Sequence, residues 1–352
     1  MRELISRDGQ PSQLDASRDG SRLRRFPYHF GLVVFVLLAG LLRAQSRIPV
    51  VFDSNIGDDI GNEFALALAL QSPELNVRAV TVVGDNAENR LRLAWKVLGL
   101  YGRRDIALGR GASEPLLDST VGHSSHLEIL TPEDLLPPGM NRDAIGLIVN
   151  TVLYSSEPVT LIATGPLTDI ALALKADPRI KQNIARIVVA GGAFHPPGAE
   201  YNMQRDRIAA EIVFTSGVPI TVVSRDVTNG CTLEAGDLAR LRAAQNPASQ
   251  FLVQLIELWQ KGQGSEHLIL HDPLAVAVSF RPALIQSQPG NVSVEIADPK
   301  TYGVTRFLPA DQLPTGPPPK TALVSQVDSR AFLDLLIERL AAPSRTDGPG
   351  PR

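Results

Sequence analysis

Residues 49–70 read PVVFDSNIGDDIGNEFALALAL, and they set the architecture of the whole chain. The apolar run predicts a buried strand over 47–53 that ends in an acid, Asp53. A polar turn with glycine follows, and the alanine- and leucine-rich residues 62–71 predict a helix. Because open α/β sheets bind ligands at the carboxyl ends of their strands, the side chains of this turn are candidate ligand contacts.

Several side chains of this turn carry oxygen: Asp53, Asn55, Asp58, Asp59 and Asn62. Such oxygens suit a hard cation such as calcium together with a polyhydroxylated substrate. The alternative interpretation is a solvated acidic turn between a strand and a helix.

Strands and helices alternate through the following residues. Strands are predicted at 77–83, 105–108, 158–163, 186–190 and 219–224, and helices at 86–101, 143–154, 167–175, 178–183 and 206–216. This alternation is typical of a doubly wound, mainly parallel sheet with helices on both faces, a Rossmann-like α/β fold. Later segments predict helices at 237–243, 249–261, 272–280 and 329–340 and a small antiparallel addition of strands at 292–297, 303–307 and 321–324.

The amino terminus resembles an export signal. Arg22, Arg24 and Arg25 precede the apolar segment 31–42, and small residues follow at 44–46. About twelve apolar residues are too few to span a bilayer, so a cleaved signal is favoured over a retained membrane anchor. We therefore expect a disordered start and signal over 1–46, one domain over 47–342, a disordered tail over 343–352, and a periplasmic or extracellular location.

Composition excludes several function classes. The formal net charge of −3 argues against a nucleic-acid partner, and the single cysteine, Cys231, excludes an internal disulfide. The sequence contains no P-loop, no dinucleotide-binding glycine motif after the first strand, and no G-x-S-x-G turn of an α/β-hydrolase.

Three more polar segments follow predicted strands or an apolar run: Thr164-Gly165-Pro166, Glu200-Tyr201-Asn202 and His271-Asp272-Pro273. Each has a plain structural explanation as a turn, a helix cap or a core histidine. Together with the first turn, however, they would meet at one edge of one sheet. That convergence favours a ligand site.

These segments, in this order, resemble the inosine-uridine-preferring nucleoside hydrolase family over about residues 48–332. The matching stretches are VVFDSNIG, LIATGPLTDIALAL, RIVVAGGAF, AEYNMQRDRIAAEIVF, VPITVVSRDVT and LHDPLAVA. The resemblance implies a calcium-dependent hydrolase that splits a ribonucleoside into ribose and base.

Residue roles follow from the same resemblance. It implies calcium ligands at Asn55, Asn62, the Thr164 carbonyl and Asp272, ribose contacts at Glu200 and Asn202, and His271 beside the departing base. Asn62, Asp85 and Asn86 are further candidate substrate contacts, and Asn55 and Asp59 join His271 as candidate catalytic residues. Relatives commonly form dimers or tetramers, so a homodimer or homotetramer is expected.

The first turn departs from the family pattern Asp-x-Asp-x-Gly-x-Asp-x-Asp-Asp, because Asn55, Gly61 and Asn62 stand where that pattern has acids. An amide oxygen can bind calcium but cannot accept a proton from water at neutral pH. Since calcium affinity follows ligand charge, we expect weak calcium binding, unless Asp58 or Asp59 compensates. The alternative function is a catalytically impaired relative that binds a ribosyl or sugar ligand.

Overall fold

The computed structural model describes residues 46–117, 127–140, 143–263 and 268–345. Residues from Ser46 onward group into one compact unit. The apolar segment 31–42 and most of the predicted tail lie outside the described residues, so the predicted signal stays a prediction. Within the described ranges, no helix is both long enough and apolar enough to cross a membrane.

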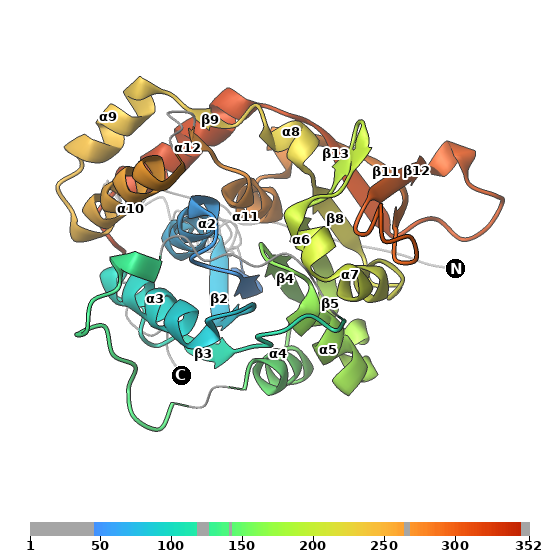
Figure 1. The fold of residues 1–352 in the computed structure, drawn as a ribbon, viewed down its shortest axis with the longest axis horizontal. Helices are drawn as coiled ribbons and strands as arrows, with labels where there is room; N and C mark the ends of the chain where they lie inside the picture. Colours follow the sequence, from blue (N-terminus) through green and yellow to red (C-terminus); the bar gives the residue numbers. More distant parts are fainter. Residues whose placement is uncertain (1–45, 118–126, 141–142, 264–267, 346–352) are drawn as a thin grey trace, which may run out of the picture. The chain divides into compact units, whose positions relative to one another are not determined.

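The described residues form a nine-stranded sheet in the order β12-β11-β13-β8-β5-β4-β1-β2-β3 (Figure 1). Its strands are β1 Ile48–Ser54, β2 Leu75–Val82, β3 Ala107–Arg110, β4 Val159–Ala163, β5 Ile184–Ala190, β8 Ile220–Val223, β11 Ile285–Val294, β12 Thr305–Pro309 and β13 Thr321–Val327. Every pair from β3 to β13 is parallel, and only β11 runs antiparallel to its neighbours. The predicted doubly wound, mainly parallel sheet is confirmed.

Helices cover both faces of this sheet. They are α2 Ile60–Gln71, α3 Ala87–Leu100, α4 Ala144–Leu153, α5 Thr168–Ala176, α6 Tyr201–Arg205, α7 Arg207–Phe214, α8 Arg225–Thr228, α9 Ala235–Ala243, α10 Pro247–Gln263, α11 Asp272–Phe280 and α12 Ser329–Ala341. Successive residues of β1 alternate between two cores: Val50 and Phe52 pack with α2, α3, α11 and α12, whereas Val51 packs with α4, α5 and α7. Because side-chain direction alternates along a strand and a core lies on each face of the sheet, β1 is buried on both faces.

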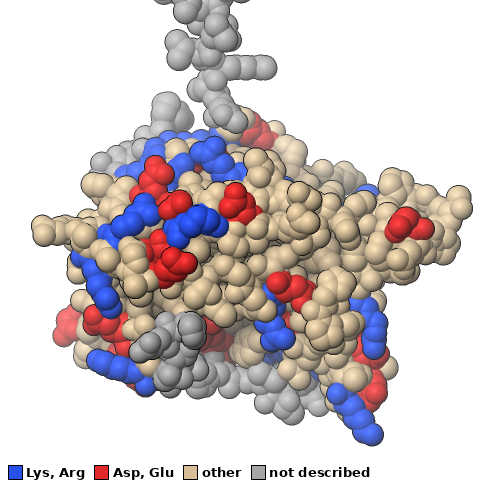
Figure 2. Space-filling model, turned by 90° about the horizontal axis from the view of Figure 1, so that it is seen from above, with Lys and Arg blue, Asp and Glu red and all other residues tan. Residues whose placement is uncertain are grey.

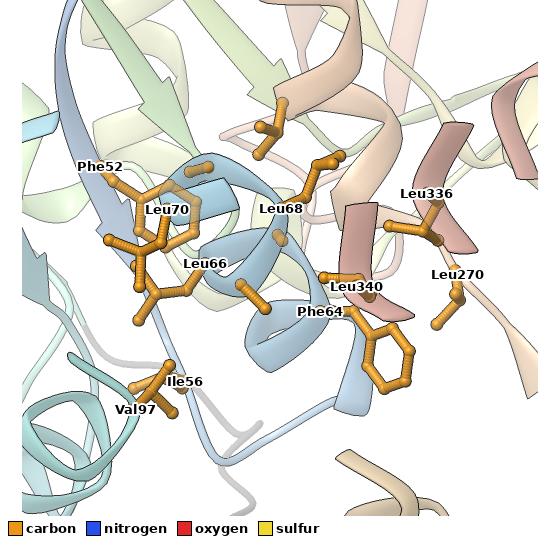
Figure 3. Close-up of a cluster of buried hydrophobic side chains, with 14 of the residues drawn as sticks. Phe52, Ile56, Phe64, Leu66, Leu68, Leu70, Val97, Leu270, Leu336 and Leu340 are labelled. Carbon is orange, nitrogen blue, oxygen red and sulfur yellow. The ribbon is translucent and has the colours of Figure 1, made fainter. Parts of the chain in front are cut away.

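Helix α2 lies at the centre of the larger core, against α3, α10, α11 and α12. All of its residues are buried. Figure 3 shows Phe64, Leu66 and Leu68 of this helix among side chains of the surrounding elements. A helix with neighbours on all sides must be apolar around its circumference, which explains the continuous FALALAL run. The same packing fixes the polar turn that precedes the helix.

Some predicted elements differ in detail. Residues 178–182 form a 3-10 helix, η2 Pro178–Gln182, and the predicted strand 292–297 is the end of the longer β11. The short helices α6 and α8 and the two-stranded pairs β6–β7 and β9–β10 were not predicted. Each is too short to show a hydrophobic period. The remaining short elements are η1 Leu127–Ile129, η3 Pro282–Leu284, η4 Ala310–Gln312, β6 Ala193–Phe194, β7 Pro197–Gly198, β9 Thr232–Leu233 and β10 Leu268–Ile269.

The late strands extend the main sheet instead of forming a separate layer. β13 pairs in parallel with β8, and β11 and β12 follow as antiparallel edge strands. On the face shown in Figure 2, acidic and basic side chains are interspersed among uncharged ones. That face carries no extended patch of one charge.

Candidate active site

A cavity of about 490 Å³ opens at the carboxyl ends of β1 and β4. From β1 the chain continues to β2 on one side of the sheet, whereas β4 and β5 lie on the other. Such a reversal of strand order is where doubly wound sheets bind ligands. Most predicted site residues line this cavity: Asn55, Asp59, Asn62, Thr164, Glu200, Asn202, His271 and Asp272.

Asn55 is held in one orientation by its neighbours. Its Nδ2 donates to Oδ2 of Asp58 at 3.0 Å, and the hydroxyl of Tyr201 donates to the same oxygen at 3.1 Å. Because the amide nitrogen is used in this way, Oδ1 is the atom left over. It is buried and has no hydrogen-bond partner. A buried oxygen without a donor beside a cavity fits a ligand that supplies positive charge.

The fully buried Arg90 of α3 fixes the backbone of this turn. Its Nη1 donates to the carbonyls of Asn55 at 2.7 Å and Ile56 at 2.9 Å. Its Nη2 forms ion pairs with Asp58 at 2.7 Å and Asp85 at 2.8 Å. Since a buried ion pair needs full hydrogen bonding to offset desolvation, Arg90 clamps the turn as one unit.

Asn62 lines the cavity, but its carbonyl oxygen is already engaged. Oδ1 accepts hydrogen bonds from the hydroxyls of Ser54 at 2.7 Å and Thr164 at 2.8 Å. Nδ2 donates to the carbonyl of Asp59 at 3.3 Å. Asn62 therefore connects β1 to β4. Both lone pairs of its Oδ1 are used by these hydroxyls, so this arrangement does not support the predicted role of Asn62 as a calcium ligand.

Gly61 leaves room for two carboxylates. A Cβ at this position would lie 2.6 Å from Oδ2 of Asp272 and 3.0 Å from Oδ1 of Asp59. Asp59 caps helix α2, where its Oδ1 accepts from the amide of Gly61 at 2.7 Å. The acid that the family pattern places at 61 is missing, and the carboxylates of Asp59 and Asp272 flank the space it would fill.

Burial and mutual repulsion raise the pKa values of these acids. Burial raises the pKa of Asp59, against the opposing effects of the Gly61 amide and His271. Burial raises the pKa of Asp272 well above its usual value, and the charges of Asp59, Glu200 and Glu63 raise it further. Acids that repel one another around a cavity form a site whose negative charge a bound cation would relieve.

Glu200 and Asn202, at the start of α6, also line the cavity. Glu200 caps α6 and accepts from the amides of Asn202 at 3.1 Å, Gly192 at 3.0 Å and Met203 at 3.3 Å. Burial raises the pKa of Glu200, while these amides and Arg225 favour its charged form. Asn202 donates from Nδ2 to the carbonyls of Thr164 at 3.2 Å and Ala190 at 3.1 Å, which joins the ends of β4 and β5.

His271 precedes helix α11 and contacts α8. Its Nδ1 lies 2.5 Å from the hydroxyl of Thr228. Burial lowers the pKa of His271, Asp59 raises it and Arg225 lowers it. Since the net shift is downward, the imidazole is mainly neutral at neutral pH.

Two predicted substrate contacts lie elsewhere. Asp85 and Asn86 are not among the residues that line the cavity. Asp85 accepts from Arg90 through Oδ1, and Asn86 has a left-handed backbone, with φ of 53°, just before α3. The predicted ribose contacts at 85 and 86 are therefore not supported by this arrangement.

The sequence assigned no role to four residues of the site: Tyr201, which was named only as part of a polar segment, Arg225, Thr228 and the clamp Arg90. Tyr201, Arg225 and Thr228 lie on the short helices α6 and α8, which carry no periodic signal. An arginine directly after the apolar segment VPITVVS was the sequence signal for a positively charged group at this edge.

Three buried acids lie behind the cavity. Asp53 accepts from the hydroxyl of Thr81 at 2.6 Å, and its carboxyl interacts with that of Asp169 on α5. Burial raises the pKa of Asp53 to about 7, and burial and the charge of Asp53 raise that of Asp169 well above its usual value. The pair therefore shares a proton at neutral pH. Burial also raises the pKa of Glu63, on α2, to about 8.

The oxygen donors present fit a hard divalent cation. They comprise the unpartnered Oδ1 of Asn55, the carbonyl of Thr164 and the carboxylates of Asp59 and Asp272. Within the described part of the chain, no group of three or more Asp, Glu, His or Cys side chains is arranged to hold a metal. The donor set therefore combines neutral oxygens with at most two charges, which favours weak binding.

Comparisons with known proteins decide the family. A family model described as inosine-uridine preferring nucleoside hydrolase matches residues 50–334. The chain belongs to this family. A pyrimidine-specific ribonucleoside hydrolase, RihA, from Citrobacter koseri is 36% identical over 315 residues, which cover 84% of this chain and 98% of that protein. A RihA protein from Salmonella gallinarum is 36% identical over 314 residues, 83% of this chain and 98% of its own length.

Solved structures of nucleoside hydrolases have the same fold. A plant nucleoside hydrolase, PpNRh1, superposes with a TM-score of 0.76 at 26% identity, over 85% of this chain and 100% of that one. A purine-preferring ribonucleoside hydrolase from Gardnerella vaginalis gives 0.72 at 26% identity, over 84% and 99%. This nucleoside hydrolase therefore hydrolyses the N-glycosidic bond of ribonucleosides, which releases ribose and the free base. The predicted family and reaction are confirmed.

Proposed function

We propose that this nucleoside hydrolase uses calcium and that Asp59 accepts the proton of the attacking water. Asn55, Gly61 and Asn62 stand where the family's first turn has acids, so Asp59 is an acid of this turn that remains for that role. The observation that carries the proposal is the space over Gly61, which the carboxylates of Asp59 and Asp272 flank. Calcium would be held by these two acids, Oδ1 of Asn55 and the Thr164 carbonyl. When bound, it would grip sugar hydroxyls and make a water more acidic.

The protein's own residues would perform the remaining steps. Glu200 and Asn202, fixed by backbone hydrogen bonds, bind and orient the ribose. As the glycosidic bond breaks, positive charge develops on the ribose and the nearby carboxylates stabilise it. The attacking water then loses its proton to Asp59. The raised pKa of this acid brings it closer to neutral pH, where a general base is most effective.

Two bases are candidates for the group that leaves. The pyrimidine specificity in the names of the RihA relatives makes uridine the first substrate to test. The purine preference in the name of the Gardnerella vaginalis enzyme makes inosine the second.

The test uses the full chain with uridine, inosine and p-nitrophenyl β-D-riboside, each in calcium and in chelator. We expect ribose release that depends on calcium, with half-saturation at high calcium concentration. Asp59→Asn should lose at least ~100-fold in kcat, while the exposed Asp311→Asn should keep full activity. Equal rates in chelator would overturn the calcium role. Full activity of Asp59→Asn would overturn the role of this acid. Ligand-induced thermal stabilisation without any ribose release would support the impaired binder instead.

A further inference from the structure

Arg225 is a second arginine at the site. Unlike the fully buried Arg90, it is exposed. Arg225 begins α8 and lines the cavity. In the described residues its side chain has no hydrogen bond and no ion pair. A cavity wall that is otherwise rich in carboxylates therefore carries one cationic group with its donors available. Such a group is suited to an anion, since guanidinium presents a planar fork of N–H donors.

The backbone around Arg225 fixes where this cation lies. The amide of Arg225 donates to the carbonyl of Gly192 at 3.0 Å, and the amide of Gly192 donates to Glu200 at 3.0 Å. One turn further along α8, the hydroxyl of Thr228 contacts Nδ1 of His271. The start of α8 thus lies between Glu200 and His271.

Electrostatics agree with that position. Arg225 favours the charged form of Glu200 and lowers the pKa of His271. Both effects agree with a guanidinium that lies near Glu200 and near His271 on the same wall of the cavity. Since His271 is the residue expected beside the departing base, and Thr228 of α8 contacts it, the guanidinium at the start of α8 is placed near that base.

We infer that Arg225 is a catalytic residue that stabilises the negative charge on the departing base. This inference rests on the proposed function, because it assigns a partner to the base that leaves. In the step itself, the bond between C1′ of ribose and the base nitrogen breaks, and its electron pair goes to the base. The guanidinium donates hydrogen bonds to the resulting anion, which later takes a proton from solvent. Water adds to C1′ and gives its proton to Asp59.

An electrostatic role at the leaving group differs from a structural role in a measurable way. A base such as uracil leaves poorly, so its departure needs stabilisation, whereas p-nitrophenolate leaves readily without help. A defect in Arg225 should therefore appear with nucleosides and vanish with the nitrophenyl riboside. A general loss of structure would lower both rates together.

The experiment compares the full-length wild type with Arg225→Gln, Arg225→Lys and the control Arg242→Gln, an exposed arginine on α9 that does not line the cavity. Arg225→Gln should lose about 100-fold in kcat on uridine or inosine, with little change in KM. The same variant should lose less than about threefold on p-nitrophenyl β-D-riboside. Arg225→Lys should recover part of the loss, since it keeps the charge without the planar fork.

Two results would overturn the inference alone: an equal loss on both classes of substrate, or no loss on nucleosides, in an otherwise active enzyme. A wild type that releases ribose from none of the three substrates would overturn the proposed function and this inference with it. The two failures are therefore distinguishable from the wild-type rates.

Discussion

The two walls of the cavity are built on different principles. The first-turn wall consists of Asn55, Asp58, Asp59 and Asn62, from the turn between β1 and α2. What we call the opposite wall consists of lining residues from later segments: Glu200, Asn202, Arg225 and His271. On the first-turn wall most polar atoms are hydrogen-bonded to other side chains: Asn55 donates to Asp58, and Asn62 accepts from two hydroxyls. On the opposite wall, backbone groups hold Glu200 and Asn202 in place.

The first-turn wall has amides at 55 and 62 and glycine at 61 where the family pattern has acids, so the proposed cation site has lost charge there. Amides in place of carboxylates can be packed and hydrogen-bonded without a bound cation, because they carry no charge that needs compensation. The first-turn wall is thus stable by itself, at the expected cost of weaker calcium binding. Variants on each wall, and behind them, test whether the two walls differ in this way.

The largest effect is expected on the opposite wall. Glu200→Gln removes a charge from the ribose site and turns an amide toward three backbone N–H groups. We expect kcat/KM on uridine to fall roughly 100- to 1,000-fold, with calcium affinity by calorimetry changed little. Glu338→Gln, an exposed position on α12, is the matched control. If activity survives in Glu200→Gln, the opposite wall is not the functional one.

A buried acid behind the first-turn wall should respond to pH. The pKa of Glu63 is raised to about 8, so folding favours its protonated form. The contribution of Glu63 to the free energy of unfolding should fall by about 1.4 kcal/mol per pH unit as pH rises from its unfolded pKa toward 8. Glu63→Gln lacks this loss, and its advantage should therefore grow between pH 5 and 7 and be absent at pH 4.

Urea unfolding in chelator at several pH values measures this dependence. Glu257→Gln, an exposed glutamate on α10, should differ from the wild type by the same amount at every pH. A constant difference for Glu63→Gln as well would mean that Glu63 is ionised in the folded protein.

Restoring one acid on the first-turn wall should lower its stability without calcium and strengthen its response to calcium. Asn55→Asp loses the donation to Asp58 and places two like charges together. In chelator it should unfold about 1–2 kcal/mol more easily, and calcium should raise its melting temperature more than that of the wild type. Asn291→Asp, at an exposed position of β11, is the control. Equal calcium responses in Asn55→Asp and the wild type would argue against Asn55 as a ligand.

The smallest effect is expected at the acid pair beneath the cavity. Asp53 and Asp169 each have one buried carboxyl oxygen to which no other group donates, and the shared proton lies between the two carboxyls. In Asp169→Asn the new amide can donate to Asp53 and removes the need for a shared proton. The free energy of unfolding of this variant at pH 7, measured by urea unfolding, should be about 1 kcal/mol higher than that of the wild type, with activity unchanged. A loss of stability would show that the shared proton holds the pair together better than an amide does.

Sequence by itself determined the fold class and the family, because these depend on signals that are local or ordered along the chain. The alternation of strands and helices predicts a parallel sheet, and a parallel sheet brings the residues after its strands to one edge. That is why Asn55, Thr164, Glu200 and Asp272 were placed at one site without a structure.

Tertiary structure decided which atoms of those residues are available. Only packing shows that Arg90 clamps the first turn, that Asn62 spends its oxygen on two hydroxyls, and that Asp59 and Asp272 flank the space over Gly61. It also brings Arg225, from a helix too short to predict, to the cavity wall. The orientation and partners of a side chain depend on neighbours far away in sequence, and no local pattern records them.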